Sequence, residues 1–333
     1  MKRTFFYLPL LIILTLVTLP LQAAENEIKI SVLAPEGSTW VKVMEQMNQE
    51  IQNNSGGKLA LKIYAGGVSG DEKDVIRKMR IGQVHAAAFT GVGLGQIVPS
   101  VRIMELPMLF RSYDEVDFVK GKLQPDFEKK FKAKGFELLG WSEAGFVNIF
   151  SNKPIRNKAD MSGVKFWAWE GDPLVKAMYD ALGITPIPLS LPDVLTSLQT
   201  KLIDGVYGPP LGVIALQWFT KVKNMTNINL ANSTGAILIS NKAMKKLPPD
   251  QQKILRDAAK KYSNILVSRI RSENQQAVDQ IRKAGIEIIE LDPKAQEEII
   301  SVSESVYPKL AGKLYSPALL NQVKTLLAQK RGK

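Results

Sequence analysis

Short runs of alternating apolar and polar residues predict strands in the first third of the chain, and segments with helical periodicity separate them. The predicted strands span 28–33, 59–64 and 85–90, and the predicted helices span 38–53 and 71–81. This β-α-β-α-β succession predicts a parallel sheet. Ligands of such sheets lie beyond the carboxyl ends of the strands, so the turns after Leu33 and Thr90 are candidate walls of a cleft.

A second α/β region begins near Phe146. Its predicted elements are strands over 146–150, 164–169 and the start of 205–210, and helices over 172–182, about 192–200 and 211–219. Residues 236–239 again predict a strand of the kind found in the first region. The chain therefore crosses between two regions more than once, which predicts two lobes joined by several linkers.

One helix is much longer than the others. Pro248-Pro249-Asp250 introduces it, and the chain then continues without proline or glycine to Ala284, before Gly285 ends it. At 1.5 Å per residue it would span roughly 50 Å, longer than either lobe should be. A coiled coil is the competing interpretation, but the apolar positions between Ile254 and Ile281 do not keep a strict heptad.

The N-terminus has the pattern of a secretory signal peptide. Lys2 and Arg3 precede an apolar run over 5–21, and small residues follow it, which predicts cleavage near Ala23 or Ala24. A retained membrane anchor is the competing interpretation, but the run is short for a span and contains prolines. We therefore expect an exported, periplasmic protein.

Composition removes several classes of function. The 333 residues include no cysteine and a single histidine, His85, so Ser-His-Asp triads other than one through His85, cysteine nucleophiles and cysteine-based zinc sites are excluded. The formal charge of +12 is scattered through helices such as 253–271, which indicates a solvated face and no nucleic-acid partner. Gly91-Val92-Gly93-Leu94-Gly95 lacks the Gly-Lys-Ser/Thr of a phosphate-binding loop.

Several short motifs recur in an order and spacing that resemble one family. They are Asn54-Ser55-Gly56-Gly57-Lys58, Tyr64-Ala65-Gly66-Gly67, Glu105-Leu106-Pro107-Met108-Leu109-Phe110-Arg111, Ser197-Leu198-Gln199-Thr200, Ile203-Asp204-Gly205 and Lys246-Leu247-Pro248-Pro249. The chain resembles the DctP-like solute-binding proteins of TRAP transporters. The resemblance implies a two-lobed periplasmic-binding-protein-like α/β fold that closes on a small molecule, a long helix spanning both lobes, and delivery to TRAP membrane subunits.

The resemblance also fixes the expected lobes. Lobe I comprises 25–144 and 233–268, and lobe II comprises 145–232 and 269–333, where the C-terminal helices complete the smaller lobe; residues 1–24 form the signal peptide. The absence of arginine at the family's ligand-facing positions is further similar to an arginine-lacking branch of the family that is associated with a periplasmic tetratricopeptide-repeat protein. A partner of that kind is therefore a prediction of the resemblance.

The site residues come from the family's ligand-facing positions. Trp167 stands where the family has the arginine of a Lys-x-Arg strand, and Val147 stands where a second arginine is frequent. The strand alternation places Trp169 on the same side as Trp167. The predicted ligand-binding residues are Leu33, Thr90, Phe146, Val147, Trp167, Trp169, Leu191, Tyr207 and Gly208.

An arginine-free pocket of this kind predicts a largely hydrophobic or aromatic ligand, because an anion desolvated without a partner costs several kcal/mol. An organic-acid receptor that uses donors other than the usual arginine is the alternative, and an exported enzyme that depends on carboxylates is the alternative outside this class. Glu143 and Glu170 make a weak metal site, so we expect no metal, no cofactor and no catalytic residue. For Trp141 and Trp218, a place in the core is the favoured interpretation.

Overall fold

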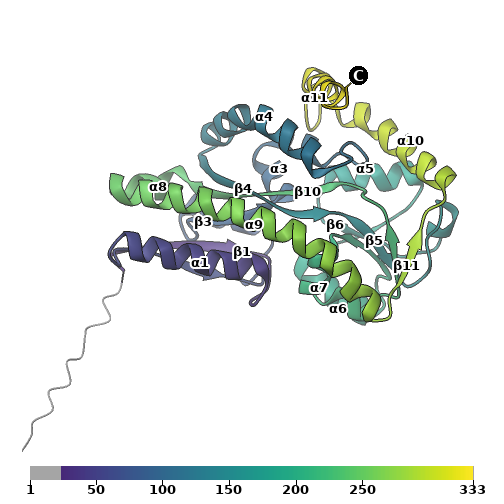
Figure 1. Ribbon diagram of the computed structural model, residues 1–333, viewed down its shortest axis with the longest axis horizontal. Helices are drawn as coiled ribbons and strands as arrows, with labels where there is room; N and C mark the ends of the chain where they lie inside the picture. Colours follow the sequence, from purple (N-terminus) through teal and green to yellow (C-terminus); the bar gives the residue numbers. More distant parts are fainter. Residues whose placement is uncertain (1–23, 333) are drawn as a thin grey trace, which may run out of the picture.

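The computed structural model describes residues 24–332 and has two main sheets, each covered by helices (Figure 1). Residues 1–23 of the predicted signal peptide, with the cleavage position at Ala23, lie outside the described residues, and Ala24 is the first residue described. The larger sheet has the strand order β2-β1-β3-β10-β4, and the smaller one has the order β11-β9-β5-β8. The mixed α/β architecture with two lobes agrees with the expected fold.

The larger sheet is mixed and not purely parallel. Its strands are β1 (Asn26–Val32), β2 (Leu59–Tyr64), β3 (Ala86–Thr90), β4 (Phe136–Phe146) and β10 (Asn232–Ser240). The predicted β1, β2 and β3 run parallel, whereas β10 inserts between β3 and β4 and is antiparallel to both. The direction of β10 is reversed because the chain re-enters this sheet from the smaller one.

The smaller sheet contains β5 (Asn148–Ser151), β8 (Gly205–Gly208), β9 (Asn224–Asn227) and β11 (Glu287–Glu290). A parallel pair, β6 (Trp167–Trp169) and β7 (Ile187–Leu189), lies beside it and is joined to it by a bridge between Phe166 and Gly205. The predicted strand over 164–169 is therefore shorter than expected. Asp204 explains the difference, because its carboxylate accepts from the Lys165 amide at 2.7 Å and its own amide donates to the Lys165 carbonyl.

Helices cover both sheets (Figure 1). The helices are α1 (Thr39–Asn54), α2 (Glu72–Ile81), α3 (Gly91–Ile97), α4 (Tyr113–Ala133), α5 (Pro173–Leu182), α6 (Val194–Gln199), α7 (Pro210–Ala215), α8 (Asn241–Lys246), α9 (Pro249–Lys283), α10 (Pro293–Leu310) and α11 (Pro317–Lys330). Short 3-10 helices are η1 (Pro99–Glu105), η2 (Ala159–Met161), η3 (Leu191–Asp193) and η4 (Trp218–Lys221).

The long helix is confirmed. α9 has 35 residues, begins with proline at its first position and is followed by Gly285 in the left-handed conformation. It packs on α1 and β4 of the larger sheet and then on α7, so it runs along both lobes, as its course in Figure 1 shows. Of the two C-terminal helices, α10 packs on α5, whereas α11 packs on α4, beside the larger sheet.

The glycine-rich segment after β3 is a helix and not a turn. α3 begins at Gly91, directly after the Thr90 cap. A side chain on Gly91 would collide with the carboxylate of Glu105, and one on Gly93 would collide with Glu72. These two glycines therefore let buried carboxylates approach the helix backbone.

The chain crosses between the two sheets at Val147 and again near residues 230–231, and these two crossings lie side by side. The predicted strand over 146–150 is divided, because β4 ends at Phe146 and β5 begins at Asn148. The amide of Val147 donates to the Ala231 carbonyl at 2.8 Å, and the Leu230 amide donates to the Val147 carbonyl at 2.9 Å. Together with α9, these crossings join the two lobes.

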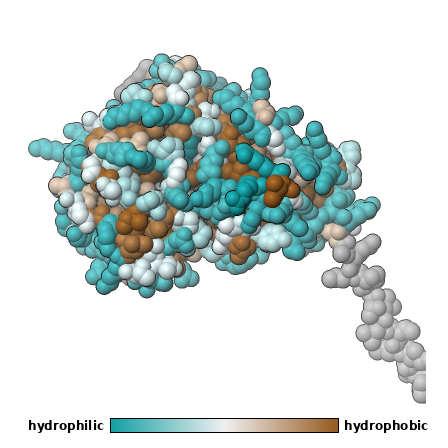
Figure 2. All heavy atoms as spheres, turned by 180° about the vertical axis from the view of Figure 1, so that it is seen from behind, coloured by the Kyte–Doolittle hydropathy of each residue, from teal (hydrophilic) through white to brown (hydrophobic). Residues whose placement is uncertain are grey.

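The face drawn in Figure 2 is largely polar and charged, with several apolar patches between the polar side chains. No helix within residues 24–332 is both long and apolar enough to span a membrane.

Candidate functional site

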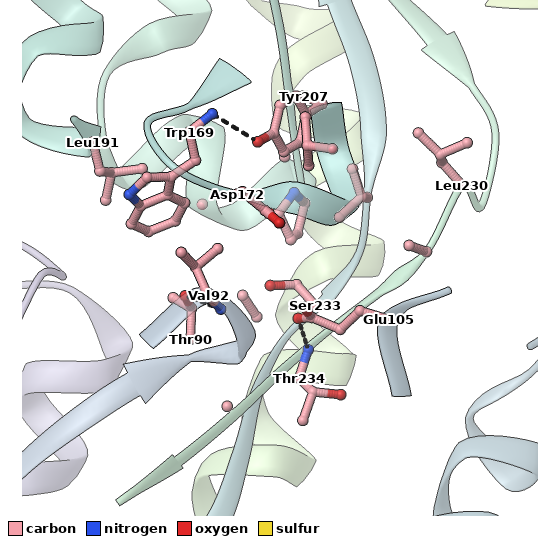
Figure 3. Close-up of a pocket in the computed structure, with 18 of the residues that line it drawn as sticks. Thr90, Val92, Glu105, Trp169, Asp172, Leu191, Tyr207, Leu230, Ser233 and Thr234 are labelled. Atoms are coloured by element: carbon pink, nitrogen blue, oxygen red, sulfur yellow. Dashed lines mark hydrogen bonds between the residues drawn. The ribbon is translucent and has the colours of Figure 1, made fainter. Parts of the chain in front are cut away.

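A cavity of about 250 Å³ lies between the two sheets (Figure 3). On one side it is lined by the ends of β1 and β3, by α3 and by η1, and on the other by β6, α5, β8 and α7. The segment after Leu33 and the start of α3 after Thr90 form part of its wall, where the parallel strands predict a cleft. The segment from Leu230 to Gly235, which enters β10, closes it from a third direction.

Eight of the nine predicted ligand-binding residues line this cavity, and one does not. The eight are Leu33, Thr90, Val147, Trp167, Trp169, Leu191, Tyr207 and Gly208. Phe146 is the exception. Its ring packs against Tyr113 with the ring centroids 4.8 Å apart, inside the core cluster beneath α4. The reason is that β4 ends at Phe146, which turns this side chain into the core and leaves Val147 at the cavity.

Trp167 is both a wall of the cavity and a core residue. It is only 1% exposed and stacks on Tyr207 with ring centroids 4.7 Å apart. Its indole nitrogen donates to the Leu189 carbonyl at 3.0 Å. The indole donor is therefore already used within the protein, and Trp167 offers a ligand a flat apolar surface.

The hydroxyl of Thr90 is likewise already used in hydrogen bonds within the protein. It donates to the carboxylate of Glu72 at 2.8 Å and accepts from the Val92 amide as the cap of α3. Glu72 also accepts from the amides of Thr90 and Gly93, at 2.6 Å each. Burial raises the pKa of Glu72 to about 8, although these hydrogen bonds oppose the rise. This carboxyl group holds the start of α3 in place.

The expectation of an arginine-free pocket is wrong. Arg102, on η1, lines the cavity and is only 4% exposed. Its Nη2 donates to Asp172 Oδ2 at 2.7 Å, and its Nη1 lies 2.5 Å from Glu105 Oε2 without hydrogen-bond geometry. We refer to Arg102, Glu105 and Asp172 as the buried charge cluster.

Both acids of the buried charge cluster have further hydrogen bonds. Glu105 accepts from the Thr234 amide at 2.8 Å, as Figure 3 shows. Asp172 accepts from the Leu174 amide at 2.9 Å and so caps α5, which begins where the sequence predicts a helix. Burial raises the pKa of Glu105 to about 7, against the opposing attraction of Arg102. Near neutral pH, Glu105 is therefore protonated for part of the time.

Hydrogen-bond donors remain without partners at the cavity. Among the described residues, Arg102 Nε and Asn232 Nδ2 are buried and make no hydrogen bond, whereas Arg102 Nη1 is paired with Glu105. Both residues line the cavity, and Asn232 lies two positions before Thr234 on β10. Because an unsatisfied buried donor costs about 1–3 kcal/mol, this region favours a ligand that brings acceptor oxygens.

Three contacts join the two sides of the cleft. Trp169 donates from its indole nitrogen to Asp71 at 2.9 Å. The exposed Glu170 pairs with Lys73 at 2.7 Å, and Asp172 pairs with Arg102. All three come from the short segment 169–172 and reach the start of α2 or η1, so this segment connects the two lobes.

The two acids considered for a metal are used in ion pairs. Glu143 accepts from Arg271 of α9 at 2.7 and 2.9 Å, and Arg271 also binds Asp117 of α4. Glu170 pairs with Lys73, as described. Within residues 24–332, no group of three or more His, Cys, Asp or Glu side chains could hold a metal ion.

Sequence reasoning missed the buried charge cluster. The only local signal is that Arg102 and Glu105 are three residues apart, the spacing of an ion pair on one helical face. Asp172 lies seventy positions farther along the chain from Arg102. A contact over that distance carries no signature in a single sequence.

The comparisons with known proteins agree with this geometry. The family model for bacterial extracellular solute-binding proteins, family 7 (DctP), matches residues 30–313. A solute-binding protein of Verminephrobacter eiseniae is 26% identical over 82% of each chain. The 2,3-diketo-L-gulonate-binding periplasmic protein of Escherichia coli K12 is 25% identical over 75% of this chain and 77% of its own.

Solved structures show the same fold. The TRAP periplasmic solute-binding protein of Sulfurospirillum deleyianum, determined with bound succinate, superposes with a TM-score of 0.86 at 21% identity. The match covers 91% of this chain and 99% of that one. With most of its length matched by the family model, the chain belongs to family 7 of the bacterial extracellular solute-binding proteins, the DctP family, and is a solute-binding receptor of the TRAP type.

Proposed function

We propose that this receptor binds an organic acid with an apolar body in the cleft between its lobes, and that donors other than the family's strand arginine recognise the acid group. The protein binds and releases this ligand without changing it. The observation that carries the proposal is that Arg102 Nε and Asn232 Nδ2 are buried at the cavity without a hydrogen-bond partner. The pocket is therefore not arginine-free, as we expected it to be, but the expectation that the ligand is largely apolar is kept.

An uncharged hydrocarbon would leave these donors unsatisfied. A carboxylate brings two acceptor oxygens with about four lone-pair sites, and hydrogen bonds to a guanidinium are about twice as strong as neutral ones. Tyr207 adds a third donor, because its hydroxyl oxygen accepts from the Trp169 amide and its proton is not spent in that bond. The acid group of the ligand would therefore lie near Arg102, Asn232 and Tyr207.

The charge of the buried charge cluster bears on an anionic ligand. With both acids ionised, the cluster carries a net negative charge that would repel a carboxylate. Because the pKa of Glu105 is raised to about 7, this carboxylate can take up a proton near neutral pH, and the cluster then has no net charge. We infer that the carboxylate binds while Glu105 is protonated, so that Arg102 is shared between Asp172 and the ligand.

The ligands of the relatives support an acid group in the ligand of this receptor, and the side chains that line the cavity support an apolar body. The E. coli relative is named for 2,3-diketo-L-gulonate, and the S. deleyianum structure holds succinate; both are organic acids. The rest of the wall here is dominated by apolar side chains, among them Leu33, Val92, Trp167, Leu191 and Leu216. A largely hydrophobic or aromatic ligand without an acid group is the second candidate, favoured by this wall alone.

A titration series distinguishes the two candidates. We expect the purified mature chain to bind apolar monocarboxylates and to bind their amides or alcohols at least tenfold more weakly by calorimetry, since charged hydrogen bonds contribute about 1.5–3 kcal/mol. Asn232→Asp should weaken the binding of the acids and leave the affinity for the neutral analogues unchanged. The matched control Asn227→Asp changes an exposed asparagine of β9. Equal affinity for acids and neutral analogues would refute the acid site.

Closure of the lobes would follow the predicted boundaries, with 25–144 and 233–268 moving against 145–232 and 269–333. Trp169→Phe removes the donor to Asp71 and should shift the population toward an open form, with a larger radius of gyration by small-angle scattering. Trp141→Phe is the control, because the Trp141 indole nitrogen has no hydrogen-bond partner and its ring packs on Phe127. An unchanged scattering curve for Trp169→Phe would contradict this part of the proposal.

Partners beyond the ligand follow from the family. Family 7 proteins are extracellular, so this receptor meets its TRAP membrane subunits on the outer side of the cytoplasmic membrane. A periplasmic tetratricopeptide-repeat partner, and membership of the arginine-lacking branch, stay predictions of the sequence resemblance. Crosslinking in the periplasm followed by mass spectrometry tests them, and recovery of the membrane subunits without any repeat protein would count against that partner.

A further inference from the structure

The cavity extends beyond the cleft and into the core of the smaller lobe. Its wall there is formed by five apolar side chains, which come from η2, the segment before β6, α5 and α10. We call the space lined by these five residues the inner compartment: Met161, Phe166, Val175, Leu182 and Ile299. All five belong to, or pack against, one hydrophobic cluster between the smaller sheet and α10. They lie outside the set of family positions that predicted the ligand site.

The polar groups next to the inner compartment are already used. The hydroxyl of Tyr179 is buried and donates to the Trp167 carbonyl at 3.0 Å. Ser303, which faces Met178 from α10, donates to the Ile299 carbonyl at 2.7 Å. A water molecule needs two to four polar partners, and apolar cavities of about 150 Å³ stay dry and bind small hydrocarbons. The inner compartment is therefore suited to hydrocarbon and not to water.

Two parts of the cavity wall differ in chemistry. Arg102, Glu105, Asp172 and Asn232 form a charged and polar part, and the apolar inner compartment adjoins it along α5, which carries Val175 and is capped by Asp172. The cavity of about 250 Å³ is lined by residues from β1 to α10. A flexible chain can adapt its shape to a wall assembled from so many elements, whereas a compact ring or a branched sugar acid cannot.

We propose that the inner compartment is a subsite for the hydrocarbon chain of a linear monocarboxylate, whose acid group lies at Arg102 and Asn232. This inference rests on the proposed function and narrows its ligand class. A dicarboxylate would place its second carboxylate against Met161 or Ile299, where desolvation without a partner costs several kcal/mol. A chain that ends in methyl meets no such cost.

Chain length is the variable that tests the subsite. We expect the affinity of the mature chain for linear saturated monocarboxylates, from butanoate to dodecanoate below their micellar concentrations, to rise about threefold to fourfold per methylene by calorimetry. The rise should stop where the chain fills the inner compartment. In Ile299→Phe, which adds volume to its end wall, the rise should stop at least two methylenes earlier, with butanoate bound as in the unchanged protein.

Two further variants keep the test decisive. Leu182→Phe fills the same compartment from a half-buried position of α5, which preserves the test if Ile299→Phe does not fold. Leu216→Phe adds the same bulk on the opposite wall, near Trp218. If Leu216→Phe shortens the preferred chain and the α5 and α10 variants do not, the chain lies beside Trp218 and the inference is wrong. Failure of all acids to bind would instead refute the proposed function.

Discussion

Replacing Arg102 with methionine is expected to lower the free energy of unfolding by about 3–5 kcal/mol and to abolish measurable binding of the acid ligand. Methionine keeps much of the side-chain volume and removes the charge. Glu105 and Asp172 would then face each other's charge in a buried site without their common partner. Urea unfolding followed by fluorescence measures the first effect, and calorimetry measures the second.

The controls for Arg102 separate burial from charge pairing. Lys73→Met removes an ion pair that joins the same two sides of the cleft but is half exposed, so it should cost no more than about 1 kcal/mol. Combining Arg102→Met with Glu105→Gln and Asp172→Asn removes the uncompensated charges and should recover much of the stability without recovering acid binding. If Arg102→Met binds the acid as before, the acid group does not lie at Arg102.

Replacing Trp167 with alanine is expected to cost about 3–5 kcal/mol of stability, which is the range for large aromatic residues removed from a core. The alanine variant loses the stack on Tyr207 and the edge contact with Trp218. It also leaves the Leu189 carbonyl without its indole donor. Because Trp167 is buried, the change affects the core as well as the wall of the cavity.

Ligand affinity distinguishes Trp167 from an ordinary core tryptophan. Trp141 is also buried but does not line the cavity, so Trp141→Ala should cost comparable stability and leave the affinity of the folded fraction unchanged. Trp167→Phe keeps a ring in the stack and is the variant for calorimetry, where we expect a fall in affinity of about tenfold. An affinity equal to that of the unchanged protein would remove Trp167 from the site.

The elements of the fold that depend on local chemistry were predictable from the sequence. Ser38, Asp172 and the Pro248-Pro249 pair start helices where they were expected, and Gly82 and Gly285 follow helix ends. Each of these signals acts within a few residues, through a cap, a fixed φ angle or a left-handed turn. The antiparallel insertion of β10 was not predictable, because it depends on pairing between distant segments.

The candidate site was predictable only in part, for a related reason. The family resemblance identifies Trp167 and Tyr207, which line the cavity, and Val147, but Phe146 as the last residue of β4 packs on Tyr113 in the core. Arg102 escaped detection because its partner Asp172 comes from the other side of the cleft. Charges that are brought together only by the tertiary fold leave no local pattern in the sequence.

Native mass spectrometry of the protein extracted from the periplasm tests most directly whether an organic acid with an apolar body fills this cleft. The mature chain would be purified without added ligands, and any bound molecule would be released by unfolding and identified by its mass and fragments. We predict an apolar monocarboxylate that is absent from the Arg102→Met variant. A bound compact dicarboxylate or sugar acid, or a hydrocarbon without any acid group, would contradict the proposal.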